Sequence, residues 1–231
     1  MGTTVEFSRP DGKRVSGYLA QPASAAGAPN LVVIQEWWGL NDQIRGVADR
    51  LAAQGYRALV PDLYRGKSTV EAAEAEHLMN DLDFADAAGQ DIRGAADYLR
   101  SSGGKCGVMG YCMGGALTVL SSMFVPGCDA AVIFYGYPPL EFVDASKISI
   151  PLQGHYGTRD VLFPTAGVDA LEAKLRAGDV DFEFHRYDAD HAFCNETQVE
   201  GHKLMPTLGY APEAAALAWD RCLGFFAKHL R

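Results

Sequence analysis

A cysteine stands at the centre of a glycine-rich segment that could present a nucleophile. Gly110, Cys112 and Gly114 alternate in the run GVMGYCMGG, residues 107–115, between an apolar stretch and a helix-forming one. A sharp strand-to-helix turn leaves no room for side chains two positions before or after its central residue, and this is the setting of a nucleophile elbow. The turn would hold the Cys112 thiol at a helix amino terminus, which favours a thiolate and an oxyanion. The other interpretation is a structural cysteine buried at the start of a helix.

Two later loops offer the base and the acid that a cysteine nucleophile requires. In α/β-hydrolases the order along the chain is nucleophile, acid, histidine. Asp160 follows the apolar run 150–155, and His191 follows the run 182–187. Order and position therefore predict that Cys112, Asp160 and His191 act together. The competing acids and histidines are Asp188, Asp190, His155 and His185.

The elements that must position these residues alternate in type along the chain. Short apolar runs predict strands at 31–35, 56–60, 105–109, 130–135, 150–155 and 182–187. Apolar residues three and four apart predict helices at 42–54, 86–100, 113–122, 166–177 and 212–230. A hairpin of residues 5–7 and 15–19 precedes them. We expect one α/β domain over residues 1–231, with a mostly parallel central sheet, helices on both faces, and ligand sites at the carboxyl ends of the strands.

Composition limits the partners and the compartment. Twenty Lys and Arg against 29 Asp and Glu give a net charge of −9, which disfavours nucleic acid or an anionic membrane as a partner. The five cysteines are odd in number and form no C-x-x-C pair, so at least one is free and a cytoplasmic location is expected. No apolar run is long enough for a signal sequence or a membrane span. We expect no metal and no cofactor, and the oligomeric state stays open.

Short motifs along the chain resemble one enzyme family. The motifs are Gln35-Glu36-x-x-Gly39, Pro61-Asp62-Leu63-Tyr64, Gly110-Tyr111-Cys112-Met113-Gly114-Gly115, Gly157-x-x-Asp160 and His191-Ala192-Phe193. Together they resemble the dienelactone hydrolase family of the α/β-hydrolase fold, over nearly the whole chain. The cysteine at the elbow is the discriminating mark, because most relatives in the wider fold carry serine there. The resemblance implies a carboxymethylenebutenolidase-like hydrolase that cleaves an ester or lactone through a thioester.

The resemblance also assigns roles to individual residues. It implies that Cys112 is the nucleophile, that His191 is the base, and that Asp160 orients the histidine. The backbone N–H groups of Met113 and Trp37 would form the oxyanion hole.

A second set of residues is expected around the substrate. The resemblance implies that Glu36 holds the resting thiol until a substrate displaces it. Aromatic residues near the predicted strand ends could form the wall of an apolar pocket. The candidate pocket residues are Trp38, Tyr135, Tyr137 and Asn195.

The chain differs from the family at the positions whose side chains would bind the substrate carboxylate. Family members that cleave dienelactone use two arginines, one of them four positions after the histidine, where this chain has Asn195. No arginine lies between Arg65 and Arg93, a stretch that instead carries Glu71, Glu74 and Glu76. Asn and Glu cannot replace a bidentate guanidinium, so we expect a neutral or differently presented ester or lactone as the substrate.

Other classes of function remain to be weighed against a hydrolase. A dinucleotide oxidoreductase would need G-x-G-x-x-G near the first strand, and residues 110–115 lack that spacing. A zinc site could use His191, Cys194 and His202 by residue type, but their spacing matches no closed zinc module. The main alternative is a non-catalytic protein on the same fold in which Cys112 senses oxidants.

Overall fold

An eight-stranded sheet runs through the molecule in the order β1-β2-β4-β3-β5-β6-β7-β8. The computed structural model describes residues 1–231. The strands are β1 (Thr3–Ser8), β2 (Arg14–Ala20), β3 (Asn30–Ile34), β4 (Arg57–Pro61), β5 (Cys106–Tyr111), β6 (Ala130–Phe134), β7 (Leu152–Gly157) and β8 (Phe182–Tyr187). The β1–β2 and β2–β4 pairs are antiparallel, and every other pair is parallel. The mostly parallel sheet and the leading hairpin that the sequence predicts are therefore confirmed.

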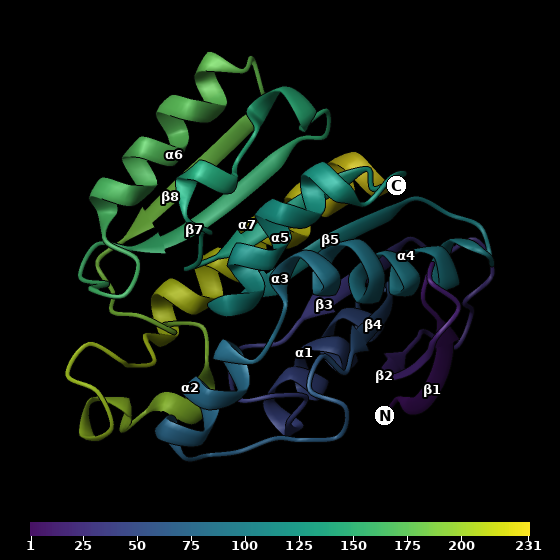
Figure 1. The fold of residues 1–231 in the computed structure, drawn as a ribbon, viewed down its shortest axis with the longest axis horizontal. Coiled ribbons are helices and arrows are strands. Elements are labelled where there is room, and N and C mark those ends of the chain that lie inside the picture. The colour runs from purple at the N-terminus through teal and green to yellow at the C-terminus, as the bar shows by residue number, and fades with distance from the viewer.

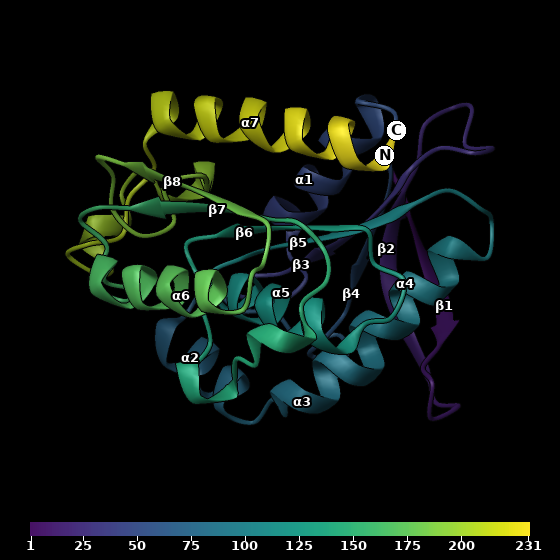
Figure 2. The same cartoon turned by 90° about the horizontal axis from the view of Figure 1, so that it is seen from above.

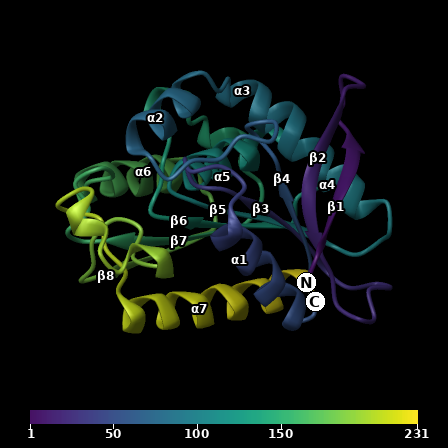
Figure 3. The ribbon, with the colours of Figure 1, turned by 90° about the horizontal axis from the view of Figure 1, so that it is seen from below.

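Helices cover both faces of this sheet. They are α1 (Asp42–Ala53), α2 (Ala72–Asn80), α3 (Phe84–Asp86), α4 (Arg93–Arg100), α5 (Met113–Phe124), α6 (Thr165–Ala177) and α7 (Pro212–Leu230). Seen from above, α1 and α7 lie on one side of the sheet and the other helices lie on the opposite side (Figure 2). The view from below shows the same two layers, with β1 and β2 at one edge (Figure 3). No helix combines the length and the apolar composition that crossing a membrane requires.

The strands form where the chain is apolar without interruption. Every residue of β3, β4, β5 and β6 is buried, because helices pack on both faces of these central strands. The largest difference from the expected helices is α2, which the sequence did not predict. Only Ala75 and Leu78 of this helix are buried, so its apolar repeat is too short to be recognised.

The predicted helix over residues 86–100 is not uniformly α-helical. It begins with α3, continues as a π-helical segment, Ala87–Ile92, and ends as α4. The π-helical segment carries Asp91, whose side chain is only 1% exposed. Hydrogen bonds to this carboxylate connect the π-helical segment to the rest of the fold.

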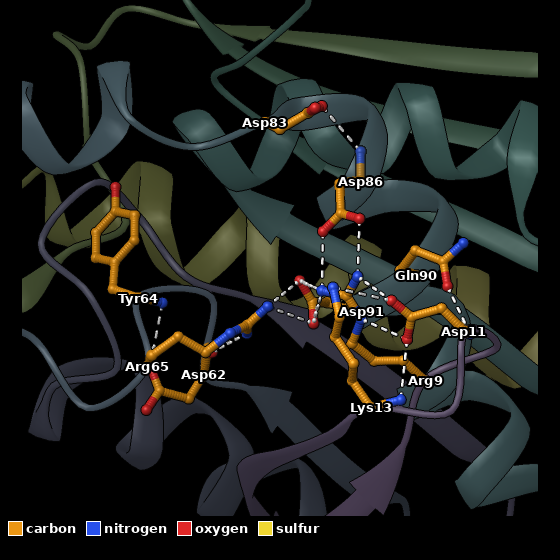
Figure 4. Close-up of polar contacts among 10 residues, drawn as sticks. All are labelled: Arg9, Asp11, Lys13, Asp62, Tyr64, Arg65, Asp83, Asp86, Gln90 and Asp91. Carbon is orange, nitrogen blue, oxygen red and sulfur yellow. Dashed lines mark hydrogen bonds and ion pairs between the residues drawn. The ribbon is translucent and has the colours of Figure 1, made fainter.

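Two arginines from distant parts of the chain meet Asp91 (Figure 4). Arg65, in the loop after β4, places its Nη2 2.9 and 2.8 Å from the two carboxylate oxygens. Arg9, in the β1–β2 turn, reaches Asp91 at 3.4 Å and also pairs with Asp86 and Asp11 at 2.8 Å. This Arg9–Asp91 network ties the hairpin, the loop after β4 and the π-helical segment together.

The topology brings the loops of interest to one end of the sheet. The arrowheads of β7 and β8 point to the lower left of Figure 1, toward α2 and the loop that follows β8. Strands β3, β5, β6, β7 and β8 are parallel neighbours, so the loops that follow them gather at the same edge.

Candidate active site

Cys112 occupies a strained turn between β5 and α5. Its φ of 56° and ψ of −117° are rare for a residue with a side chain. A Cβ at Gly110 would collide with the carbonyl oxygen of Gly114, and a Cβ at Gly114 would lie 2.5 Å from the carbonyl oxygen of Ile34. The glycines at both flanking positions are therefore sterically required. This geometry is that of the nucleophile elbow that the sequence predicts.

The thiol of Cys112, the ring of His191 and the carboxylate of Asp160 form a continuous hydrogen-bonded chain. Nε2 of His191 lies 3.1 Å from Sγ of Cys112, and Nδ1 lies 2.7 Å from Oδ2 of Asp160. The other oxygen of Asp160 accepts hydrogen bonds from the N–H groups of Leu162 and Phe163, at 2.9 and 3.0 Å. These bonds fix the carboxylate, which in turn orients the imidazole toward the sulfur.

The competing acids and histidines are engaged elsewhere. Arg159 forms ion pairs with both Asp188 and Asp190 outside the site. His155 is buried inside the sheet, where its ring stacks on that of His185. The structure therefore selects Asp160 and His191 from the alternatives that the sequence left open.

A zinc site at His191, Cys194 and His202 finds no counterpart in the structure. No group of three or more His, Cys, Asp or Glu side chains within residues 1–231 is arranged to hold a metal ion. His191 is instead engaged by Cys112 and Asp160.

The protonation of His191 reflects its two partners. Burial by itself would lower the pKa of the imidazole. The neighbouring Cys112 sulfur and the hydrogen bond to Asp160 outweigh burial and raise the pKa of His191 to about 10. The imidazole is also enclosed by aromatic rings, with Phe163 stacked at 5.5 Å and Tyr135 edge-on at 5.2 Å between ring centroids. The site therefore favours the protonated form of the His191 imidazole.

The backbone N–H groups of Met113 and Trp37 donate no hydrogen bond to neighbouring helix, loop or turn carbonyls. Met113 is the first residue of α5, so its N–H has no acceptor within the helix. The N–H of Trp37, in the loop after β3, donates no hydrogen bond to other loop or turn carbonyls. Both residues line the same pocket as Cys112. The hydroxyl of Tyr64, which sequence reasoning did not single out as a site residue, donates to Sδ of Met113 at 3.2 Å and steadies that side chain.

Glu36 lies in the site but is not in hydrogen-bond contact with the thiol. Its Oε1 accepts a hydrogen bond from the Tyr135 hydroxyl at 3.1 Å, and its Oε2 accepts one from Nδ2 of Asn195 at 2.6 Å. Burial raises the pKa of Glu36, opposed by the charge of His191 and by these two hydrogen bonds. In this structure Sγ of Cys112 is hydrogen-bonded to His191 and not to Glu36, and the expected role of Glu36 toward the resting thiol stays a prediction.

A pocket of about 650 Å³ opens over the thiol. It is lined mostly by apolar side chains, and it contains no lysine and no arginine. The only carboxylates on its wall are those of Glu36 and Glu76. Several lining residues that sequence reasoning missed come from α2 and from the loops after β7 and β8, among them Ala72, Ala73, Met79, Leu162, Phe163, Met205 and Leu208.

Of the four expected pocket residues, two line this cavity and two do not. Trp38 and Tyr137 line the pocket. Tyr135 is completely buried and turns its hydroxyl to Glu36, so it does not form part of the pocket wall. Asn195 is 1% exposed and is likewise committed to Glu36. Sequence position placed both near the site, but only the packing of their side chains decides which way they face.

The mostly parallel sheet, the strained elbow after β5 and the site at the carboxyl ends of the strands define an α/β-hydrolase. The chain matches the model of the dienelactone hydrolase family over residues 15–230. It belongs to that family.

Individual relatives agree with this assignment along their whole length. The chain is 32% identical to "Protein usf" of Aquifex pyrophilus, with 100% of each chain covered. It is 28% identical to a protein of Aquifex aeolicus named "Putative carboxymethylenebutenolidase", again with 100% of each covered. Among solved structures, a "Putative Dienelactone Hydrolase" from Klebsiella pneumoniae superposes with a TM-score of 0.82 at 27% identity, over 99% of this chain and 100% of that one.

Proposed function

We propose that this member of the family hydrolyses a carboxylic ester or lactone with Cys112 as the nucleophile, His191 as the base and Asp160 as its orienting acid. The observation that carries the proposal is the position of the thiol, on a strained elbow 3.1 Å from Nε2 of a histidine whose other nitrogen faces a buried carboxylate. Nucleophile, base and orienting group within hydrogen-bond reach are the signature of covalent acyl transfer.

Acylation would begin with attack of the Cys112 thiolate on the substrate carbonyl carbon. The carbonyl oxygen becomes an oxyanion, which the N–H groups of Met113 and Trp37 stabilise. The tetrahedral intermediate then collapses, the bond to the alkoxide oxygen breaks, and the alkoxide takes the proton from the His191 imidazolium. The product is a thioester on Cys112 and a hydroxyl group, which stays attached to the acyl chain if the substrate is a lactone.

Deacylation reverses the roles of the same groups. Once the sulfur is acylated it carries no charge, so the largest influence that raises the pKa of His191 is removed. The neutral imidazole can then take a proton from water as the water oxygen attacks the thioester. Collapse of this second intermediate expels the Cys112 thiolate and releases the carboxylic acid, which restores the thiolate–imidazolium pair.

The substrate class follows from the pocket wall. A wall that carries Glu36 and Glu76 but no lysine or arginine offers no guanidinium or ammonium group to a substrate carboxylate. The apolar remainder would bind a compact hydrophobic acyl or alcohol group. We therefore propose neutral esters or lactones as substrates, and not the anionic dienelactone.

Replacing the sulfur tests the proposal directly. With 4-nitrophenyl butyrate, the wild-type chain should release a burst of nitrophenol stoichiometric with protein, and mass spectrometry should find the acyl group on Cys112. Cys112→Ala should lose both, whereas Cys128→Ala, a buried cysteine remote from the pocket, should keep them. Turnover that survives in Cys112→Ala would contradict the nucleophile. Absence of turnover on every ester, combined with reversible oxidation of Cys112 by peroxide, would favour the redox-sensing alternative.

The free thiols also bear on the compartment. All five cysteines are unpaired in the structure. Because free thiols persist in reducing surroundings, we propose a cytoplasmic location.

A further inference from the structure

A second cavity, of about 200 Å³, lies beside α1 and α7, the two helices that cover one side of the sheet (Figure 2). Helix α1 contributes Arg50 to its wall and α7 contributes Trp219. The active-site pocket is lined instead by α2 and the start of α5, from the other side of the sheet, and no residue lines both cavities. We call the smaller one the rear cavity, and its main lining residues are Arg50, Tyr111, Phe134, Cys194, Tyr210 and Trp219.

The ends of two central strands form the inner wall of the rear cavity. Tyr111 is the last residue of β5 and Phe134 is the last residue of β6. Each stands directly before a residue of the active-site region, Cys112 in one case and Tyr135 in the other. Because successive side chains of a strand point to opposite faces of a sheet, these strand ends can serve two separate cavities.

The wall of the rear cavity is largely aromatic. The rings of Tyr111 and Phe134 stack with their centroids 4.5 Å apart and their planes at 22°. Tyr210 and Trp219 add two further rings to the wall. A cavity of roughly 150 Å³ with an apolar lining is large enough to bind benzene. The volume of the rear cavity therefore fits a molecule with one aromatic ring and a small substituent.

The charged groups at the rear cavity compensate one another. The guanidinium of Arg50 lies 4.9 Å from the ring centroid of Trp219 and 3.9 Å from the carboxylate of Glu196. Burial raises the pKa of the Cys194 thiol well above its ordinary value, so this lining residue carries no charge at neutral pH. The wall therefore offers no uncompensated charge, which favours a neutral ligand.

One buried polar group of the rear cavity has no partner. The side chain of Tyr111 is 2% exposed, and its hydroxyl makes no hydrogen bond to a protein group, whereas the neighbouring Tyr135 hydroxyl donates to Glu36. Burial raises the pKa of the Tyr111 hydroxyl, and the charges of Arg50 and Glu196 act on it in opposite directions, as expected for a hydroxyl that lies at the cavity they line. Buried hydroxyl groups are normally hydrogen-bonded, so a ligand would supply the missing partner.

We propose that the rear cavity binds a neutral compound with a single aromatic ring, whose hydroxyl or carbonyl group forms a hydrogen bond with Tyr111. The ring would pack against Phe134 and Trp219. This inference goes beyond the proposed hydrolase function and does not depend on it, because it uses neither the Cys112 thiol nor the His191 imidazole.

The probe is 4-fluorophenol, which combines one ring, one hydroxyl group and a fluorine that NMR detects. Its fluorine chemical shift, followed during a titration with the wild-type chain, should show saturable binding with a Kd of about 1 mM, the affinity expected for a ligand of this size. Absence of saturation up to about 10 mM would overturn the proposal.

Two matched substitutions locate the bound probe. Ala215, on α7, lines the rear cavity and is half-buried, so Ala215→Phe should fill the cavity and abolish binding. Ala72, on α2, is also half-buried but lines the active-site pocket, so Ala72→Phe should leave the Kd unchanged. The opposite pattern would place the probe in the active-site pocket and would overturn the proposal. Circular dichroism should show both variants folded.

A third variant tests the hydrogen bond. Tyr111→Phe should weaken binding of 4-fluorophenol about fivefold, the value of one hydrogen bond between neutral groups. Binding of 4-fluorotoluene, which has the same ring but no hydroxyl group, should not weaken in this variant. Equal affinity of 4-fluorophenol for the wild type and Tyr111→Phe would overturn the assigned role of Tyr111. None of these measurements uses turnover, so failure of the hydrolase proposal would leave them unaffected.

Discussion

At the scale of single residues, the chemistry of this site depends on how one imidazole is charged. His191 is almost completely buried, which would ordinarily keep it neutral. The sulfur of Cys112 on one nitrogen and the carboxylate of Asp160 on the other reverse that tendency and raise its pKa to about 10. The same imidazole can be a proton donor while the sulfur is an anion and a base once the sulfur is acylated.

The pKa of His191 should therefore depend on the charge of its neighbour. In the wild-type chain the imidazole should stay protonated through neutral pH and titrate near 10. In Cys112→Ala the sulfur, which is the largest influence that raises the pKa of His191, is absent, and the pKa should fall toward its ordinary value of about 6.5. The chemical shift of the His191 ring protons, followed by NMR across pH 5 to 11, measures both values. Identical titration in the two proteins would contradict the thiolate–imidazolium pair.

At the scale of elements, contacts between distant segments fix the positions of the loops around the site. The Arg9–Asp91 network connects the β1–β2 turn, the loop after β4 and the π-helical segment (Figure 4). Burial raises the pKa of Asp91, and the charges of Arg65 and Arg9 oppose that shift. The loop after β4 also carries Tyr64, whose hydroxyl reaches Met113 at the elbow.

Removing the Arg9 side chain should lower the free energy of unfolding. Its side chain is 3% exposed, and Arg9→Met leaves Asp91 with Arg65 as its only cationic partner. Breaking one partner of a buried ion pair is strongly destabilising, so we expect a loss of about 2–3 kcal/mol in the free energy of unfolding. Urea denaturation measures this loss.

The matched control lies on the neighbouring strand. Arg14 is 60% exposed and pairs with the exposed Glu6, so Arg14→Met should change the free energy of unfolding by less than about 0.5 kcal/mol. Equal effects of the two substitutions would show that the Arg9–Asp91 network contributes no more than a surface ion pair.

At the scale of the whole molecule, the pocket exists only because remote segments converge. The loop after β3, the elbow, α2 and the loops after β6, β7 and β8 all contribute to its wall. The chain carries a net charge of −9, and Glu76 adds an exposed carboxylate at the pocket. The overall field and the local wall therefore both disfavour an anionic substrate.

Reversing one charge should change this preference. We expect 4-nitrophenyl butyrate to be preferred to mono(4-nitrophenyl) succinate, a similar ester with a carboxylate. Glu76→Lys should raise kcat/KM for the succinate about fivefold, because it replaces repulsion by attraction of about 1 kcal/mol, and added salt should reduce the gain. Glu74→Lys, on the same helix but outside the pocket wall, should have a smaller effect. A preference for the succinate in the wild type would contradict the proposed substrate class.

Local sequence patterns were sufficient to predict the class of fold, the family and the residues to examine. Continuous apolar runs such as the one at Leu31–Ile34 predict buried parallel strands because strand burial is encoded locally. The alternation of Gly110, Cys112 and Gly114 predicts the elbow because its steric requirement extends over only two residues on either side.

The directions of the remaining side chains depend on packing between distant segments. Tyr135 and Asn195 face Glu36 and not the substrate pocket, and α2 closes over the thiol with only two buried residues of its own. Such choices are made by packing between segments up to 159 positions apart, the separation of Glu36 and Asn195. A local pattern cannot specify them, because the partner that decides the orientation lies outside any window in which periodicity or turn chemistry operates.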